Sequence, residues 1–146
     1  MAKIAIGSDL KNELTDALEK WLSERGHTVE RFGALAPPDD DAWTSVARNV
    51  GKAVASGACE RGIVCCWTGT GASIAANKVR GVRAALCFDA ATAEGARTWN
   101  DANVLALSLR ATSVAVGEEI LEAFLAGEPT TDPRYRAMID DLAAGG

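Results

Sequence analysis

Short apolar runs alternate along this chain with longer stretches of helical period, a pattern typical of β-α-β units and a parallel sheet. Five of these runs are expected to be strands, at 3–7, 28–32, 62–66, 82–87 and 104–107. Their residues are continuously apolar rather than alternating, as in strands that are covered on both faces. The sequence therefore predicts an α/β fold with a five-stranded parallel sheet.

The stretches between these runs have the spacing of helices. Helices are predicted around 14–22, 46–54, 73–79, 90–98 and 113–125, the first two ending before Gly26 and Gly57. Right-handed crossovers then give a doubly wound sheet flanked by helices. At 146 residues, with no internal repeat, the chain is expected to form one domain over 1–146. Residues 143–146 are expected to fray.

The composition of the chain limits which kinds of partner it is expected to bind. The net charge is −5, so no basic excess is available for nucleic acid. No run of 18 apolar residues and no leader pattern is present, which favours a cytoplasmic protein without membrane contact. The four cysteines form no Cys-x-x-Cys pair, so disulfides, a zinc site or another metal site are not expected.

The loops at the carboxyl ends of parallel strands form the ligand crevice of such a fold. Ser8 and Asp9 follow the first strand, and Gly69 and Gly71 follow the third. The two glycines permit a tight turn into a helix, whose free N–H groups and dipole can hold an anion such as a phosphate or an enediolate. A Gly-x-Gly turn alone is equally consistent with a plain strand-to-helix connection.

Cys66 makes the turn after the third strand chemically more interesting. Its thiol ends the strand and faces the start of the next helix, a position that favours the thiolate and suits a base or a nucleophile. Cys65 should point to the opposite face as a core residue, and Cys87 should also lie in the core.

The residues in 69–79, 81–87 and 100–107, together with Ile4-Ala5-Ile6-Gly7-Ser8-Asp9, resemble the ribose-5-phosphate isomerase B and galactose-6-phosphate isomerase family. The likeness covers nearly the whole chain. It implies a cofactor-free aldose–ketose isomerase on a Rossmann-like sheet, acting on a small sugar or sugar phosphate. It also implies a homodimer or homotetramer whose active site is completed by a neighbouring subunit.

The resemblance also assigns roles. Cys66 matches the base that moves the C2 proton, and Thr68 matches a threonine that shifts a proton between O1 and O2. Asp9 and Asn100 match residues that hold sugar hydroxyls, with Ser8 beside them. The residues matching the anion hole are Gly69, Thr70, Gly71, Ala72 and Ser73. Because Ala72 stands where one branch of the family has a glutamate base, only cysteine chemistry is expected.

Several positions depart from the family. Leu10 and Trp99 stand where histidines are usual, and the one histidine of the chain, His27, lies before the second strand. Trp67 replaces a glycine and Trp43 lies near a usual tyrosine. The indoles at positions 43, 67 and 99 are expected to line a changed pocket that stacks on a sugar; the alternative is that positions 43 and 99 pack at an oligomer interface.

Three arginines are candidates for binding a substrate phosphate. Arg110 follows the fifth strand, while Arg134 and Arg136 lie in the C-terminal segment. A guanidinium suits bidentate phosphate contact. The alternative is that these side chains are simply solvated.

Three functional interpretations stay open. The first is isomerisation through a cis-enediolate, of the ribose 5-phosphate to ribulose 5-phosphate type. The second is a non-catalytic sugar- or metabolite-binding subunit, suggested by the missing histidines. The third is epimerisation or isomerisation of a different, even unphosphorylated, sugar through the same intermediate.

Overall fold

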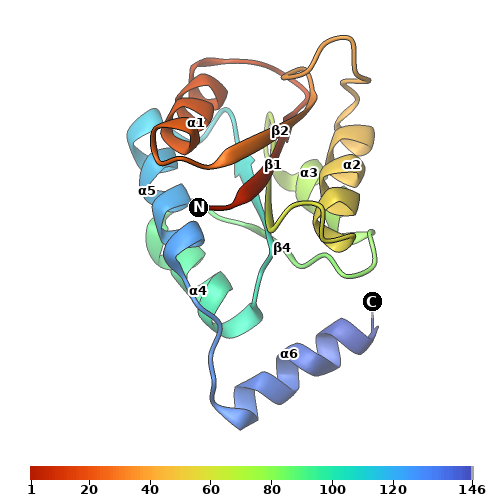
Figure 1. The fold of residues 1–146 in the computed structure, drawn as a ribbon, viewed down its shortest axis with the longest axis vertical. Coiled ribbons are helices and arrows are strands. Elements are labelled where there is room, and N and C mark those ends of the chain that lie inside the picture. The colour runs from red at the N-terminus through yellow and green to blue at the C-terminus, as the bar shows by residue number, and fades with distance from the viewer. Residues whose placement is uncertain (146) are drawn as a thin grey trace.

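The computed structural model describes residues 1–145 and contains a five-stranded parallel sheet in the order β2-β1-β3-β5-β4. The strands are β1 (Lys3–Ser8), β2 (Thr28–Gly33), β3 (Arg61–Cys66), β4 (Ala84–Leu86) and β5 (Val104–Ser108). All five predicted strands are therefore confirmed. Their carboxyl ends lie at the top of the molecule in Figure 1, on the side away from α6.

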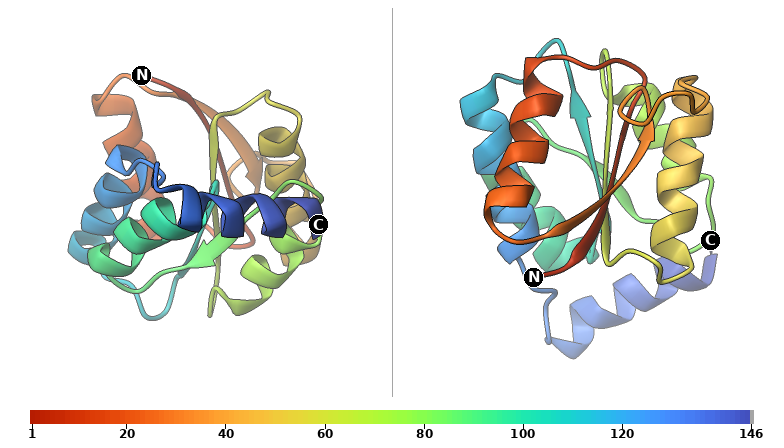
Figure 2. Two further views of the ribbon diagram at one scale, coloured as in Figure 1. Left: turned by 90° about the horizontal axis from the view of Figure 1, so that it is seen from below. Right: turned by 45° about the horizontal axis from the view of Figure 1, so that its top comes forward.

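Helices cover both faces of the sheet, as a doubly wound fold requires (Figures 1 and 2). The helices are α1 (Glu13–Glu24), α2 (Trp43–Ala55), α3 (Thr70–Asn77), α4 (Ala90–Asn100), α5 (Val114–Ala126) and α6 (Pro133–Gly145). Helix α5 packs against both α1 and α4 on one face, and α2 packs against α3 on the other. The predicted fold class is confirmed.

The central strands divide their side chains between two cores. Ile63 and Cys65 of β3 join the cluster under α1, α4 and α5, whereas Val64 and Cys66 join the cluster under α2 and α3. Successive strand residues point to opposite faces of a sheet. The predicted separation of Cys65 from Cys66 is therefore confirmed, and Cys87 lies in the first cluster as expected.

Glycines in β1 and β3 allow α2 to approach the sheet closely. A Cβ on Gly7 would come within 2.6 Å of Val46 Cγ1, and a Cβ on Gly62 within 2.7 Å of Val50 Cγ1. Because α2 lies this close, its first residue, Trp43, is held at the carboxyl edge of β1 and β3, where it lines the same pocket as Cys66.

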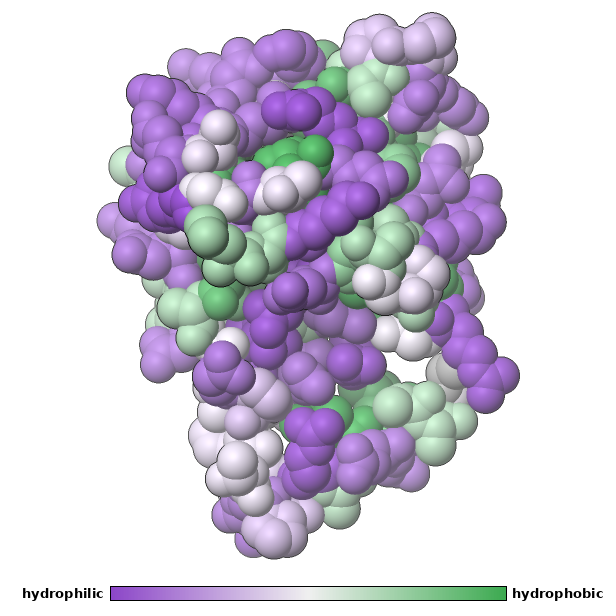
Figure 3. All heavy atoms as spheres, in the orientation of Figure 1, coloured by the Kyte–Doolittle hydropathy of each residue, from purple (hydrophilic) through white to green (hydrophobic). Residues whose placement is uncertain are grey.

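Helix α6 is the one element not predicted from the sequence. In Figure 3 a gap separates part of this helix from the body of the molecule. A pocket of about 660 Å³ lies between the C-terminal residues of α6 and the chain before and within β4. The α6 residues Tyr135, Met138, Ile139 and Leu142 follow an i, i+3, i+4, i+7 spacing, so the helical period is present in the sequence, although only Ile139 is buried. The expectation of a frayed end is wrong for 143–145, which are helical, and residue 146 lies outside the described residues.

Two predicted boundaries also differ. Strand β4 covers three residues rather than six, because the Val82 amide bonds the carbonyl of Val79 in a turn and the Arg83 amide bonds the Asn103 side chain. Helix α3 begins at Thr70 rather than at position 73. The first turn of α3 therefore follows Cys66 more closely than the sequence indicated.

Candidate active site

A shallow pocket of about 260 Å³ lies at the carboxyl edge of β1 and β3. It is lined by Asp9, Trp43, Cys66, Trp67, Thr68, Thr70 and Gly71. These residues come from three places: the loop after β1, the first residue of α2, and the turn between β3 and α3. The structure thus brings together most of the residues predicted for the site from the first and third loops.

Cys66 is the thiol of this pocket. It ends β3 with its side chain 5% exposed, and its carbonyl accepts a hydrogen bond from the Leu109 amide over 2.9 Å. Burial raises the pKa of Cys59 and Cys87 to about 11 each and that of Cys65 to about 12. Those three thiols stay protonated near neutral pH, so Cys66 is the cysteine placed for proton transfer with a ligand in the pocket.

The turn after Cys66 is fixed by Gly69. This residue has a φ of 77°, and a Cβ on it would lie 2.6 Å from Leu86 Cδ1 and 2.9 Å from the Leu107 carbonyl carbon. A side chain is therefore excluded both by backbone conformation and by space. The tight turn lets α3 begin four residues after Cys66.

The N-terminus of α3 has no side-chain cap. The Ser73 amide bonds the Gly69 carbonyl over 3.1 Å as the first intrahelical bond, so the preceding amides of the turn, including those of Gly71 and the buried Ala72, lack intrahelical partners. Beside them the hydroxyls of Thr68 and Thr70 share a hydrogen bond of 2.8 Å. Such a group of donors suits an oxyanion.

Asp9 supplies the carboxylate of the pocket. Its Oδ1 atom is buried and has no hydrogen-bond partner among the described residues. Desolvation is the main cause that raises the pKa of Asp9, and the charge of Asp41 adds to the rise. The neighbouring Ser8 is fully buried, and its hydroxyl donates to the Leu10 carbonyl over 2.5 Å. Ser8 thus shapes the loop, while Asp9 offers an acceptor to a ligand.

Two indoles form a wall of the pocket. Trp43 lies against Gly71, where a Cβ would come within 3.0 Å of the ring atoms Cε3 and Cζ3. The backbone carbonyl of Trp67 accepts hydrogen bonds from Ser108 Oγ and from the Arg110 amide, each over 3.0 Å. Arg110 is therefore beside Trp67 at the edge of the sheet where the pocket lies.

The remaining predicted residues lie at the opposite edge of the sheet. Trp99 and Asn100 end α4, which returns the chain to the amino ends of the strands. Arg134 and Arg136 belong to α6, which crosses that same edge (Figures 1 and 2). Within one chain the structure does not bring these four residues to Cys66.

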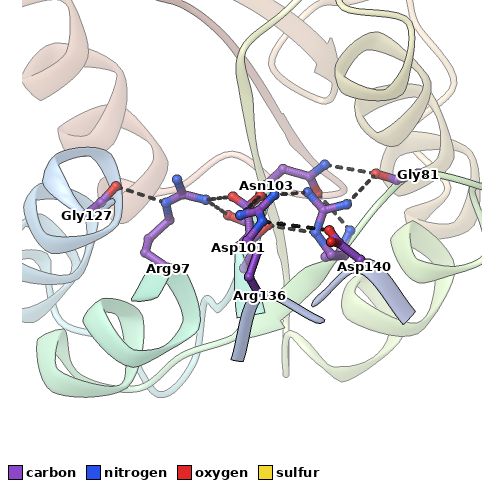
Figure 4. A network of polar contacts seen from close by, with 9 residues as sticks. Gly81, Arg97, Asp101, Asn103, Gly127, Arg136 and Asp140 are labelled. Atoms are coloured by element: carbon purple, nitrogen blue, oxygen red, sulfur yellow. Dashed lines mark hydrogen bonds and ion pairs between the residues drawn. The ribbon is translucent and has the colours of Figure 1, made fainter. Parts of the chain in front are cut away.

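Two residues at the amino edge were given no role by the sequence analysis. Tyr135 packs edge-on against Trp99 with ring centroids 5.0 Å apart. Asp101 Oδ2 pairs with Arg136 over 3.7 Å and with Arg83 over 3.6 Å, while its Oδ1 pairs with Arg97 (Figure 4). In the sequence, Asp101 lies in the family-like stretch 100–107, just beyond the helix predicted over 90–98; in the structure it forms the left-handed cap of α4.

Among residues 1–145, no group of three or more His, Cys, Asp or Glu side chains is arranged to hold a metal ion. Within the same residues, no helix combines the length and the apolar character needed to cross a membrane.

Comparisons with known proteins agree with this geometry. A family model described as Ribose/Galactose Isomerase matches residues 4–142. D-erythrulose-4-phosphate isomerase of Pectobacterium atrosepticum is 38% identical over 133 residues, covering 88% of this chain and 85% of that protein. Ribose-5-phosphate isomerase B of Escherichia coli is 38% identical over 149 residues, covering 99% and 96%.

A solved structure gives the same result. Type B ribose 5-phosphate isomerase of Trypanosoma brucei superimposes with a TM-score of 0.89 at 36% identity, covering 99% of this chain and 98% of that one. The match extends over the whole sheet and includes the turn after β3. The chain therefore belongs to the ribose/galactose isomerase family, whose enzymes are aldose–ketose isomerases of sugar phosphates.

Proposed function

We propose that this protein interconverts the aldose and ketose forms of a sugar phosphate through a cis-enediolate, with Cys66 as the general base. The observation that carries the proposal is that Cys66 lines one pocket with the turn that leads into the uncapped start of α3. A base and an oxyanion site within one pocket are the two elements that proton transfer next to a carbonyl requires.

The proposed reaction begins with the open-chain aldose. The Cys66 thiolate takes the proton from C2, the electron pair forms a C1–C2 double bond, and the C1 carbonyl oxygen becomes an oxyanion. The amides at the start of α3 stabilise that charge. Thr68 assists transfer of the O2 proton to O1. Cys66 then returns its proton to C1 while the C2–O2 double bond forms, and this step yields the ketose without any co-reactant.

A second copy of the chain is proposed to complete the site. Trp99, Asn100, Arg134 and Arg136 lie at the edge of the sheet opposite Cys66, so they can reach a ligand in this pocket only from a neighbouring subunit. Trp99 leaves about half of its surface exposed beside Tyr135. Within one subunit, the candidate for the phosphate is Arg110, whose backbone amide bonds the carbonyl of Trp67, a residue that lines the pocket.

Mixing two variants tests this second copy. We expect Cys66→Ala and the double variant Trp99→Ala and Asn100→Ala each to be inactive, and their refolded mixture to recover about a quarter of the wild-type activity, because half of the dimers are mixed and each holds one intact site. A mixture as inactive as its parts would contradict a site shared between subunits.

Solvent deuterium exchange tests the reaction itself. Incorporation at C1 or C2, followed by NMR, should fall by about 10²- to 10⁴-fold in Cys66→Ala, the usual contribution of a general base. Cys59→Ala is the matched control, because Cys59 is buried but does not line the pocket. Unchanged exchange in Cys66→Ala would refute the proposed base. Ligand binding by calorimetry without exchange in the wild type would favour a non-catalytic binding subunit instead.

The length of the substrate is not fixed by the family. One of the relatives above is named for a four-carbon substrate and another for a five-carbon one. The choice for this chain therefore depends on its own pocket.

A further inference from the structure

The acid–base groups available in the pocket are few. Of the side chains that line it, Asp9 and Cys66 alone titrate, and Cys66 is engaged at C2. The chain has a single histidine, His27, whose Nδ1 accepts a hydrogen bond from the Ala2 amide over 3.1 Å at the amino edge of the sheet. His27 precedes β2, at the opposite end of the strand order from β4, whereas the residues proposed to come from a second copy lie in α4 and α6, which contain no histidine. Neither the lining of the pocket nor those two helices therefore supplies an imidazole.

The lack of an imidazole bears on the choice of substrate, because most sugar phosphates are cyclic in solution. Opening a ring requires one proton to leave the anomeric hydroxyl and another to reach the ring oxygen, and imidazole is the side chain best suited to that exchange near neutral pH. A five-carbon aldose with a 5-phosphate closes its ring through the C4 hydroxyl. A four-carbon aldose whose C4 oxygen carries the phosphate has no hydroxyl placed to form a five- or six-membered ring, so it needs no ring opening.

The side chains that line the pocket also favour a short substrate. Trp43 lies over Gly71 so closely that a Cβ on Gly71 would come within 3.0 Å of the indole ring. Trp67 follows Cys66 directly, with its carbonyl fixed by Ser108 and Arg110. Their side chains remain 44% and 55% exposed, and the volume left beside them is about 260 Å³. Trp67 stands where the family resemblance expects a glycine, so its indole adds bulk beside Cys66 that a glycine would not.

Building on the proposed isomerase function, we infer that the substrate is a four-carbon aldose or ketose with an anionic group at C4. Such a compound has no ring form. Trp67, which lines the pocket together with Trp43, sets this chain length, and Arg110 lies on the same edge to meet the anionic end. The missing imidazole and the two indoles then have one common explanation, because both suit a short substrate that is always open.

Three substrates distinguish the effect of chain length on kcat/KM from the effect of ring opening. Erythrulose 4-phosphate is short and open, ribulose 5-phosphate is one carbon longer but also open, and ribose 5-phosphate is longer and mainly cyclic. We expect kcat/KM for ribulose 5-phosphate to be about 10- to 200-fold below that for erythrulose 4-phosphate, the range for one extra carbon in a fitted pocket. Ribose 5-phosphate should be poorer still, because only its minor open form is competent.

Two substitutions test the assigned residue. Trp67→Gly should raise the ratio of kcat/KM for ribulose 5-phosphate to that for erythrulose 4-phosphate at least tenfold, whereas Trp67→Phe, which keeps an aromatic wall, should preserve the wild-type preference. Because the Trp67 side chain is largely exposed, both variants should keep the wild-type melting temperature. An unchanged ratio in Trp67→Gly would overturn the role given to this indole.

The wild-type result distinguishes this inference from the function on which it rests. If ribose 5-phosphate or ribulose 5-phosphate reacts as well as erythrulose 4-phosphate, the inference is wrong while the isomerase function stands. If none of the three substrates exchanges its C1 or C2 proton, the proposed isomerase function fails as well.

Discussion

Arg97 Nη1 donates a hydrogen bond to Asp101 Oδ1 over 2.9 Å at the end of α4 (Figure 4). The Arg97 side chain is 2% exposed and also donates to the carbonyls of Ala102 and Gly127. Asp101 in turn pairs with Arg83 from the connection before β4 and with Arg136 from α6. One carboxylate therefore links three parts of the chain at the amino edge of the sheet.

Replacing Arg97 should be costly for stability. Arg97→Met keeps much of the apolar stem but leaves the carbonyls of Ala102 and Gly127 without their donor, so the free energy of unfolding should fall by about 3–5 kcal/mol, as for other broken buried pairs. Urea denaturation measures the loss. Lys20→Met is the control, because Lys20 and its partner Glu24 are exposed, and it should cost about 0.3–0.5 kcal/mol. Similar losses in both variants would contradict a buried role for Arg97.

Gly69→Ala tests the turn that follows Cys66. Gly69 and Gly57 both have a positive φ, of 77° and 82°, but a Cβ on Gly57 has no neighbour within 4 Å. Gly57→Ala should therefore cost only the conformational penalty, about 1–2 kcal/mol. Gly69→Ala should cost about 1–3 kcal/mol more through the clash with Leu86 and Leu107, and it should also lower kcat. Equal melting temperatures for the two variants would show that the turn adapts.

Asp9 should make the protein less stable as the pH rises. The pKa of Asp9 is raised in the fold, so the native state holds this proton more tightly than the unfolded chain does. Stability is then lost as the pH rises from the ordinary carboxyl pKa through the raised one. Asp9→Asn should remove this loss when unfolding is measured from about pH 4 to about pH 7.

Asp40 should change stability with pH in the opposite sense, and it serves as the control for Asp9. The Ala42 amide and the Ser45 hydroxyl donate to its carboxylate and lower its pKa. Its contribution is present above the ordinary carboxyl pKa and is lost as the pH falls through the lowered one. Asp40→Asn should therefore flatten the rise of stability with pH below about pH 4, whereas Asp9→Asn should flatten the fall of stability above about pH 4. A change of the same sign in both windows would refute the assignment for Asp9.

Alkylation should distinguish the pocket thiol from the other cysteines. With pKa values of about 11 to 12, Cys59, Cys65 and Cys87 have at most about one thiolate in a thousand at pH 8. Iodoacetamide should therefore modify Cys66 first, as peptide mass spectrometry would show, and the fast phase should be absent from Cys66→Ser. Earlier labelling of Cys59 would contradict this order.

Much of this fold was predictable because the information is local. Residues 62–66 form an apolar run covered on both faces, and such a run can be recognised without its neighbours. Cys66 and Gly69 were predictable as a pair for the same reason, since a strand, a tight turn and a helix start follow one another directly in the chain. Even so, the closeness of Trp43 to Gly71 was not predictable, because it depends on how near α2 approaches β1 and β3.

The sequence by itself determined the order of strands and helices, the turn after β3 and the chemical character of Cys66. Only the tertiary structure decided where α6 packs, that Asn100 and Cys66 lie at opposite edges of the sheet, and that Asp101 joins three arginines. The physical reason is that apolar periodicity records which face of one element is apolar, and not which other element that face meets. Helix α6 carries such a period, but its ion pair with Asp101 and its ring contact with Trp99 join segments far apart in the chain and leave no local pattern.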